Sequence, residues 1–94
     1  MLTTVETLQK MKDELMVKGW TRAKFEDEDG RVCLLGSLTR SNFLNEADFI
    51  EVLEALRQVT GFSILGFNDA RGRTFNDIID VLDKAIMNEK EKVG

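Results

Sequence analysis

The chain has 94 residues, of which 43% are hydrophobic and 32% charged, and its net charge at pH 7 is −4. We expect residues 1–94 to form a single globular domain that buries a core without cross-links. The acidic balance argues against a nucleic-acid backbone as the main partner, because binding to phosphates depends on clustered Lys and Arg.

The compartment is indicated by cysteine usage and by hydropathy. Cys33 is the single cysteine, so no internal disulfide can form, which suits a reducing compartment. The N-terminus lacks the charged-then-apolar pattern of a signal peptide. The apolar runs are far shorter than the roughly 20 residues needed to span a bilayer. We therefore expect a cytoplasmic protein that does not cross a membrane.

A first helix is predicted over residues 4–18. Thr3 and Glu6 have the spacing of a capping box at its start. One apolar stripe follows at helical spacing, formed by Val5, Leu8, Met11 and Leu15. Gly19 predicts the end of the helix, because glycine takes a positive φ at low cost, and Trp20 can then fold back on the helix end.

Residues 20–33 predict a short β-hairpin that turns at an acidic run, with Gly30 at a positive φ. A two-stranded hairpin is marginal on its own. We therefore expect it to lie against the helices, with Phe25 and Val32 pointing inward.

The acidic run at residues 26–29 is typical of a solvated turn. A calcium-binding EF-hand loop is excluded by its register. With Gly30 at the sixth position of such a loop, Phe25 would be first and Gly36 twelfth, and neither supplies a side-chain oxygen.

Two helices are expected in the middle of the chain. Residues 33–40 predict a compact apolar helix in which Gly36 permits close approach by a neighbour. Residues 46–59 predict a longer helix capped by Asn45 and ended at Gly61, with the aromatic at position 62 packing on that helix.

A last helix should begin after Thr74, whose hydroxyl and Asp77 have capping spacing. Residues 88–94 have almost no apolar content and are predicted to fray. The fold class is therefore mainly α, a compact four-helix domain with a hairpin between helices 1 and 2. In the last three helices we expect these core residues: Leu34, Leu35, Leu38, Phe49, Val52, Leu53, Leu56, Val59, Ile78, Ile79, Val81, Leu82, Ala85 and Ile86.

Several short motifs occur in a characteristic order along most of the chain. They are Gly19-Trp20, Asp29-Gly30, Cys33-Leu34-Leu35-Gly36-Ser37-Leu38, Phe67-Asn68-Asp69 with Arg73-Thr74, and Asp77 through Ile86. This order resembles a family of small uncharacterised proteins of actinobacteria and their bacteriophages, in which Trp is more usual at position 67. The resemblance implies the fold and a phage or actinobacterial origin. It implies no reaction, since the family carries no assigned activity.

The sequence contains few of the residue types that usually carry out catalysis. With no His and no Tyr, the usual general bases and phenolic acids are missing. Cys33 lacks a His partner and sits in an apolar run, so we expect a buried structural thiol. Asp69 and Asp77 leave a carboxylate-based enzyme as an alternative. We expect no enzyme, no cofactor and no metal site.

A nucleic-acid-related regulator is a second alternative. A helix-turn-helix could place Arg40 and Arg57 near a DNA backbone. Its second helix would however be acidic and would repel phosphate, through Glu46, Asp48, Glu51 and Glu54. The same acidic face would suit a mimic of DNA.

The hypothesis we favour is a protein-interaction module that binds a host protein or forms a homodimer. Its candidate surface lies in the segment FNDARGRT, residues 67–74, and consists of Phe67, Asn68, Asp69, Arg71 and Arg73. Aromatic residues and Arg are enriched at interface hot spots. A structural interpretation of the same segment gives Asn68 and Gly72 to turn geometry, Thr74 to a helix cap, and Asp69 to a charge-assisted bond with Arg71 or Arg73.

Overall fold

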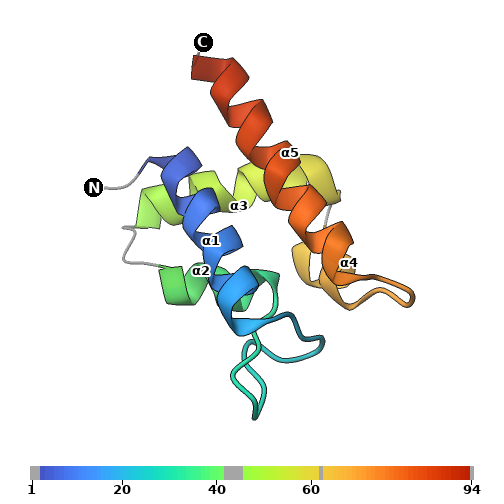
Figure 1. Ribbon diagram of the computed structural model, residues 1–94. Helices are drawn as coiled ribbons and strands as arrows, with labels where there is room; N and C mark the ends of the chain where they lie inside the picture. Colours follow the sequence, from blue (N-terminus) through green and yellow to red (C-terminus); the bar gives the residue numbers. More distant parts are fainter. Residues whose placement is uncertain (1–2, 42–45, 62, 94) are drawn as a thin grey trace.

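The computed structural model describes residues 3–41, 46–61 and 63–93. These residues form five helices and no β-strand (Figure 1). The helices are α1 (Thr4–Lys18), α2 (Leu34–Ser41), α3 (Glu46–Thr60), α4 (Ile64–Asp69) and α5 (Phe75–Val93). The prediction of a mainly α fold is confirmed, but α4 was not foreseen, so the count of four helices is wrong.

The core lies where α1, α3 and α5 meet above α2. In Figure 1, α1 crosses in front of α3, and α5 runs diagonally along the other side of the molecule. α1 packs on α2 and α5, and α3 packs on α5. The interior is almost entirely aliphatic, and its large members with no exposed area are Leu8, Met11, Leu15, Val32, Leu34, Val52, Leu56, Ile78 and Leu82.

Both predicted ends of α1 are confirmed. Glu6 N donates to Thr3 Oγ1 at 3.1 Å, and Thr3 N donates to Glu6 Oε1 at 3.0 Å. The hydrogen bond from the Thr3 backbone lowers the pKa of Glu6. Gly19 has φ of 89° and donates to Leu15 O at 2.8 Å, which ends the helix. Trp20 then packs, half-buried, against the core.

The predicted β-hairpin is not supported, because the described residues contain no β-strand. Val32 pairs with Trp20 in a parallel bridge and with Glu26 in an antiparallel one, so the chain before it wraps around both of its sides. These are isolated bridges, and none of the described residues is assigned to a β-strand. Val32 has no exposed area, as predicted, but Phe25 is 58% exposed and is not an inward anchor.

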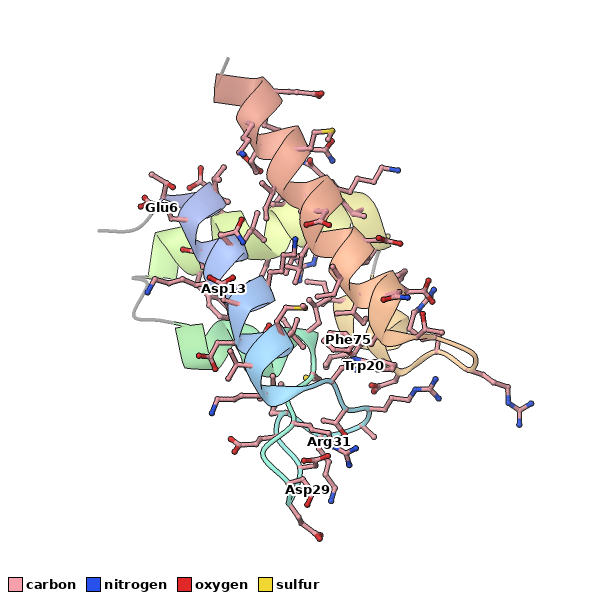
Figure 2. The ribbon with its side chains drawn as sticks, viewed as in Figure 1. Glu6, Asp13, Trp20, Asp29, Arg31 and Phe75 are labelled. Atoms are coloured by element: carbon pink, nitrogen blue, oxygen red, sulfur yellow. The ribbon has the colours of Figure 1, made fainter. Side chains whose placement is uncertain are left out.

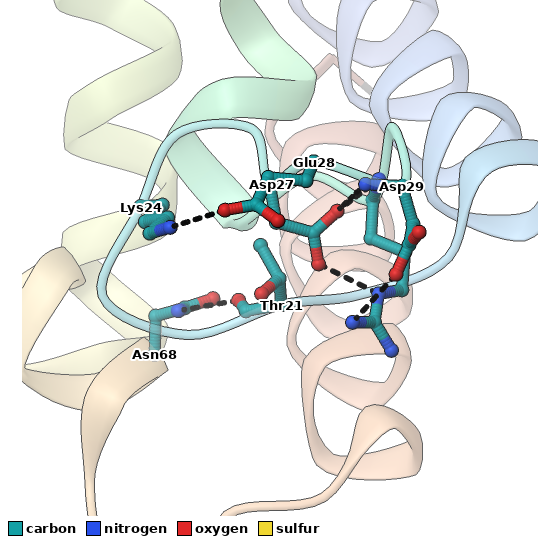
Figure 3. A network of polar contacts seen from close by, with 7 residues as sticks. Thr21, Lys24, Asp27, Glu28, Asp29 and Asn68 are labelled. Atoms are coloured by element: carbon teal, nitrogen blue, oxygen red, sulfur yellow. Dashed lines mark hydrogen bonds and ion pairs between the residues drawn. The ribbon is translucent and has the colours of Figure 1, made fainter.

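The acidic turn is organised by Asp27. Its Oδ1 accepts from Asp29 N at 3.0 Å and from Arg31 N at 2.9 Å, while Oδ2 accepts from Arg31 Nε at 2.7 Å (Figure 3). Gly30 has the predicted positive φ, 84°. The acidic run therefore forms a self-contained turn.

α2 begins within one residue of its predicted start, and Leu34 and Leu38 are buried while Leu35 is half-buried. Gly36 permits the expected close approach, because a Cβ at this position would lie 2.0 Å from Phe25 O. The backbone at Phe25 therefore rests directly on α2.

α3 buries Val52 and Leu56, and Leu53 and Val59 pack half-buried against the core. Phe49 is 38% exposed, so its predicted inward position is wrong. The predicted cap at Asn45 and the contact of Phe62 with α3 lie outside the described residues.

α4 occupies a segment that the sequence assigned to a loop. Ser63 caps it, since Gly66 N donates to Ser63 Oγ at 2.9 Å.

α5 buries the core residues predicted for the last helix, with Ile79 half-buried. α5 is helical through Val93. Near its end, Lys92 Nζ donates to Gln58 Oε1 at 3.3 Å. Fraying of residues 88–94 stays a prediction.

A capping box formed by Thr74 and Asp77 begins α5. Thr74 N donates to Asp77 Oδ2 at 3.0 Å, and Asp77 N donates to Thr74 Oγ1 at 3.2 Å. Thr74→Ala is expected to lower the free energy of unfolding by about 0.5–2 kcal/mol in urea denaturation. Thr74→Ser retains the hydroxyl and should change that free energy by less than about 0.5 kcal/mol. Equal losses in both variants would contradict the cap.

Candidate functional site

Asn68 joins the candidate segment, residues 67–74, to distant parts of the chain, and its side chain has no exposed area. Its Oδ1 accepts from Trp20 Nε1 at 2.8 Å and from Leu34 N at 3.0 Å. Its Nδ2 donates to Thr21 O at 3.2 Å and to Asp69 Oδ1 at 2.8 Å. One amide thus ties α4 to the end of α1, to the start of α2 and to the segment between them, part of which is drawn in Figure 3.

Asp69 holds the residues after Trp20. Its Oδ1 accepts from Ala23 N at 2.9 Å as well as from Asn68. Ala23 has φ of 64°, an unusual conformation for a residue with a Cβ, which this bond helps to fix. The predicted charge-assisted bond from Asp69 to Arg71 or Arg73 is not formed among the described residues; Asp69 Oδ1 accepts from Ala23 N and Asn68 Nδ2 instead.

Arg73 makes its main contacts within its own loop, with Phe67. Its Nε donates to Phe67 O at 2.8 Å, and its guanidinium lies 3.5 Å from the centre of the Phe67 ring. The ion pair with Asp77 is loose, at 4.0 Å. Phe67 therefore has one ring face covered by an arginine, and both side chains are only half-exposed.

Arg22 joins this loop from a distant part of the sequence. Its NH2 group donates to Arg73 O at 2.6 Å, and its guanidinium lies 5.4 Å from the centre of the Trp20 ring. Figure 2 shows Trp20 just beyond the lower end of α1, on the side of α5. Arg22 was not predicted, because only the bend after Gly19 brings it to this loop.

Arg71 lies at the outermost turn of the segment. Arg73 N donates to Ala70 O at 3.0 Å, and Gly72 has φ of 82°, which closes a tight turn. Arg71 is exposed and makes no hydrogen bond or ion pair within the part of the chain that the structure describes. We call the three side chains Arg22, Arg71 and Arg73 the arginine corner.

The candidate residues thus have unequal positions. Asn68 is buried and Asp69 is bound to the backbone, so both build the loop, whereas Arg71 is displayed by it.

A search with family models matches residues 1–88 to DUF6197, a family of unknown function. The chain belongs to this family. Neither the search of curated proteins nor the search of solved structures gives a match.

The predicted acid–base pair is occupied by structural bonds. Asp69 Oδ1 accepts two hydrogen bonds, and Asp77 Oδ2 accepts from the backbone of Thr74.

Among the described residues, no group of three or more His, Cys, Asp or Glu could hold a metal ion. None of the described helices is long and apolar enough to cross a membrane.

Cys33 is 1% exposed, and its Sγ accepts from Gly36 N at 3.2 Å. Burial raises the pKa of this thiol, so the thiolate is disfavoured near neutral pH. We expect a thiol-reactive chromophore to label the native protein slowly and the urea-unfolded protein at the rate of a free thiol. Labelling at the same rate in both states would show an open, activated cysteine.

Proposed function

We propose that this protein is a small non-catalytic protein-interaction module whose arginine corner binds an acidic surface of another protein. We further propose that it acts in the cytoplasm, and that it comes from an actinobacterium or one of its bacteriophages, in which case the partner is a host protein. The sequence resemblance is the support for that origin.

The observation that carries the proposal is the contrast between Arg71 and the residues beneath it. The loop base is fixed by the buried amide of Asn68 and by the bonds of Arg73. Arg71 extends from that base without a partner among the described residues. A side chain displayed on a fixed loop loses little backbone entropy on binding, which favours affinity.

Charge gives the class of partner. The chain has a net charge of −4, yet Arg22 contacts the loop that carries Arg71 and Arg73. Arg can bind carboxylates through two parallel hydrogen bonds, and Arg is over-represented at interface hot spots. An acidic protein surface therefore fits this corner better than a basic or a purely apolar one.

The alternatives receive less support. Glu51 and Glu54 are exposed on α3, but Glu51 accepts from Thr4 Oγ1 at 3.2 Å and Glu54 lies 3.9 Å from Arg57. A cation therefore lies beside this acidic face, and one of its carboxylates is hydrogen-bonded within the protein, which weakens the case for a DNA mimic. The buried thiol of Cys33 likewise gives little support to a cysteine-based enzyme.

The test asks whether Arg71 contributes to partner binding without contributing to the stability of the fold. Arg71→Ala should change the free energy of unfolding by less than about 0.5 kcal/mol, as most surface substitutions do. The same variant should lose most capture of a specific partner from a lysate of the native host, read by quantitative mass spectrometry. Lys90→Ala, an exposed cation on α5, is the matched control and should capture normally.

Arg73→Ala should behave differently. It removes the bond to Phe67 O and the contact with the ring, so we expect a loss of about 1–3 kcal/mol of unfolding free energy. A molar mass measured in solution separates binding to another protein from self-association. Unchanged capture by Arg71→Ala, at unchanged stability, would show that the arginine corner is not the binding surface.

A further inference from the structure

Residues 22–25 form an open loop with two fixed ends, which we call the strap (Figure 3). At its first end, Thr21 N donates to Val32 O at 3.0 Å, and Thr21 O accepts from Asn68 Nδ2 at 3.2 Å. At its second end, the carboxylate of Asp27 accepts from the backbone of the turn that follows. The strap therefore spans two anchored points of the fold.

The strap is held by its backbone and not by buried side chains, since the side chains of residues 22–25 are all exposed. Ala23, Lys24 and Phe25 line a hollow of about 220 Å³ together with Cys33 and Leu65. A partly empty space thus lies under the strap. Segments with few buried apolar contacts open at a lower free energy than the core does.

Two hydrogen bonds of the strap reach the candidate segment, residues 67–74. Ala23 N donates to Asp69 Oδ1 at 2.9 Å, and the NH2 group of Arg22 donates to Arg73 O at 2.6 Å. Arg22 belongs both to the strap and to the arginine corner. Its place in the corner therefore depends on the position of the strap.

The closed strap carries backbone strain. Ala23 has φ of 64°, which is unfavourable for a residue with a Cβ and persists only where surrounding contacts impose it. The bond to Asp69 is such a contact, and Phe25 O accepts a further bond from Cys33 N at 3.1 Å. A few hydrogen bonds thus oppose the strain, which brings the open form close in free energy to the closed one.

We propose that the strap opens and closes as a unit while the helices stay folded, and that its closure assembles the arginine corner. In the closed form Arg22 lies beside Arg73 and the strap covers Cys33. In the open form Arg22 leaves the corner and the thiol becomes accessible. A partner that needs Arg22 together with Arg71 binds the closed form, so opening lowers its apparent affinity. This regulatory role rests on the proposed function, whereas the opening is a property of the free protein.

The rate at which Cys33 is labelled in the free protein measures the opening. The reagent is a thiol-reactive chromophore in excess, and urea is varied from zero to beyond the midpoint of unfolding. Opening of so short a segment exposes little surface, so the rate should hardly depend on urea at low concentrations. It should rise steeply only where global unfolding takes over. A rate that follows the global unfolding equilibrium at every urea concentration would overturn the proposal.

Ala23→Val should open the strap, because a β-branched residue opposes a positive φ more strongly than Ala does. We expect labelling at low urea to be about five- to tenfold faster. Lys24→Val places the same side chain at the next position, where φ is not positive, and should stay within about twofold of wild type. Thr3→Ala removes the cap of α1 and lowers global stability, yet it should leave this rate unchanged. Acceleration by Thr3→Ala equal to that by Ala23→Val would contradict a local opening.

Two arginine variants test the link to the corner. Arg22→Ala removes a bond of the closed form and should speed labelling by about two- to fivefold. Arg71→Ala changes an exposed arginine outside the strap and should label at the wild-type rate. A wild-type rate in Arg22→Ala would show that closure does not hold Arg22 in the corner, which would overturn the proposed assembly.

Amide hydrogen exchange provides a measurement that is independent of thiol chemistry. One opening breaks the bonds of both Ala23 N and Cys33 N, so these two amides should exchange with one shared free energy of opening. That free energy should lie below the values for Leu56 and Leu82 in the core. Exchange of Ala23 or Cys33 through global unfolding alone would overturn the strap. Capture by Arg71→Ala judges the arginine corner separately, so the two proposals fail in different experiments.

Discussion

Replacing Asn68 with Ala is expected to lower the free energy of unfolding by about 3–5 kcal/mol, among the largest effects a single change produces. The Asn68 side chain, which has no exposed area, accepts from Trp20 Nε1 and Leu34 N. Its removal leaves two donors without their acceptor and frees Thr21 O. Each unsatisfied buried group costs about 1–3 kcal/mol.

Urea denaturation measures this loss, and two further variants interpret it. Asn76→Ala changes an exposed asparagine on α5 and should stay within about 0.5 kcal/mol of wild type. Asn68→Asp retains an acceptor for Trp20 and Leu34 but loses the amide donor and sets a carboxylate beside Asp69. It should therefore also be strongly destabilised. A loss below about 1 kcal/mol for Asn68→Ala would mean that the amide is not the junction of the fold.

Gly36→Ala is the second large expected effect. In an ordinary helix interior this change stabilises by about 1 kcal/mol, because Gly is the poorer helix former. Here the new Cβ would lie 2.0 Å from Phe25 O, a backbone atom that cannot rotate away. The backbone at Phe25 must then move away from α2, and we expect a net loss of about 1–3 kcal/mol.

The sign of this change is the diagnostic quantity, again from urea denaturation. Gly30→Ala is the comparison, since its Cβ would meet nothing within 4 Å and only the positive φ opposes it. It should be destabilised by about 1–2 kcal/mol through backbone strain alone. Trp20 emission should shift to longer wavelength in native Gly36→Ala but not in native Gly30→Ala. A Gly36→Ala variant more stable than wild type would refute the close approach.

Features specified by neighbours in the sequence were predictable. The capping boxes at Thr3 and Thr74, the positive φ at Gly19 and Gly30, and the small-residue contact at Gly36 each follow from local chemistry. Helical spacing likewise gave most of the core. These rules act over a few residues, and the structure satisfies them.

Features that depend on distant segments were not predictable. Residues 20–33 have the composition of a hairpin, yet Val32 is contacted on both sides because Asn68 and Asp69, far along the chain, hold the preceding segment. The same cause turns Phe25 outward. α4 was missed because it is short, and its cap at Ser63 comes directly after the glycine and aromatic that were assigned to the end of the preceding helix.

The candidate site shows the same division. Composition identified residues 67–74 as unusual, but it could not separate supporting residues from displayed ones. Asn68 and Arg73 have their partners in Trp20, Leu34 and the Phe67 backbone, all set by tertiary contact. Arg22 enters the site only because the chain bends back after α1.

The most direct test of the central claim is a map of the partner's footprint. Amide and Arg side-chain NMR signals of isotope-labelled protein can be followed while the captured partner is added. We expect shifts at Arg22, Arg71 and Gly72, with the buried amide of Asn68 little changed. Shifts confined to the acidic side of α3, at Glu51 and Glu54, would contradict it and place the binding surface on that helix.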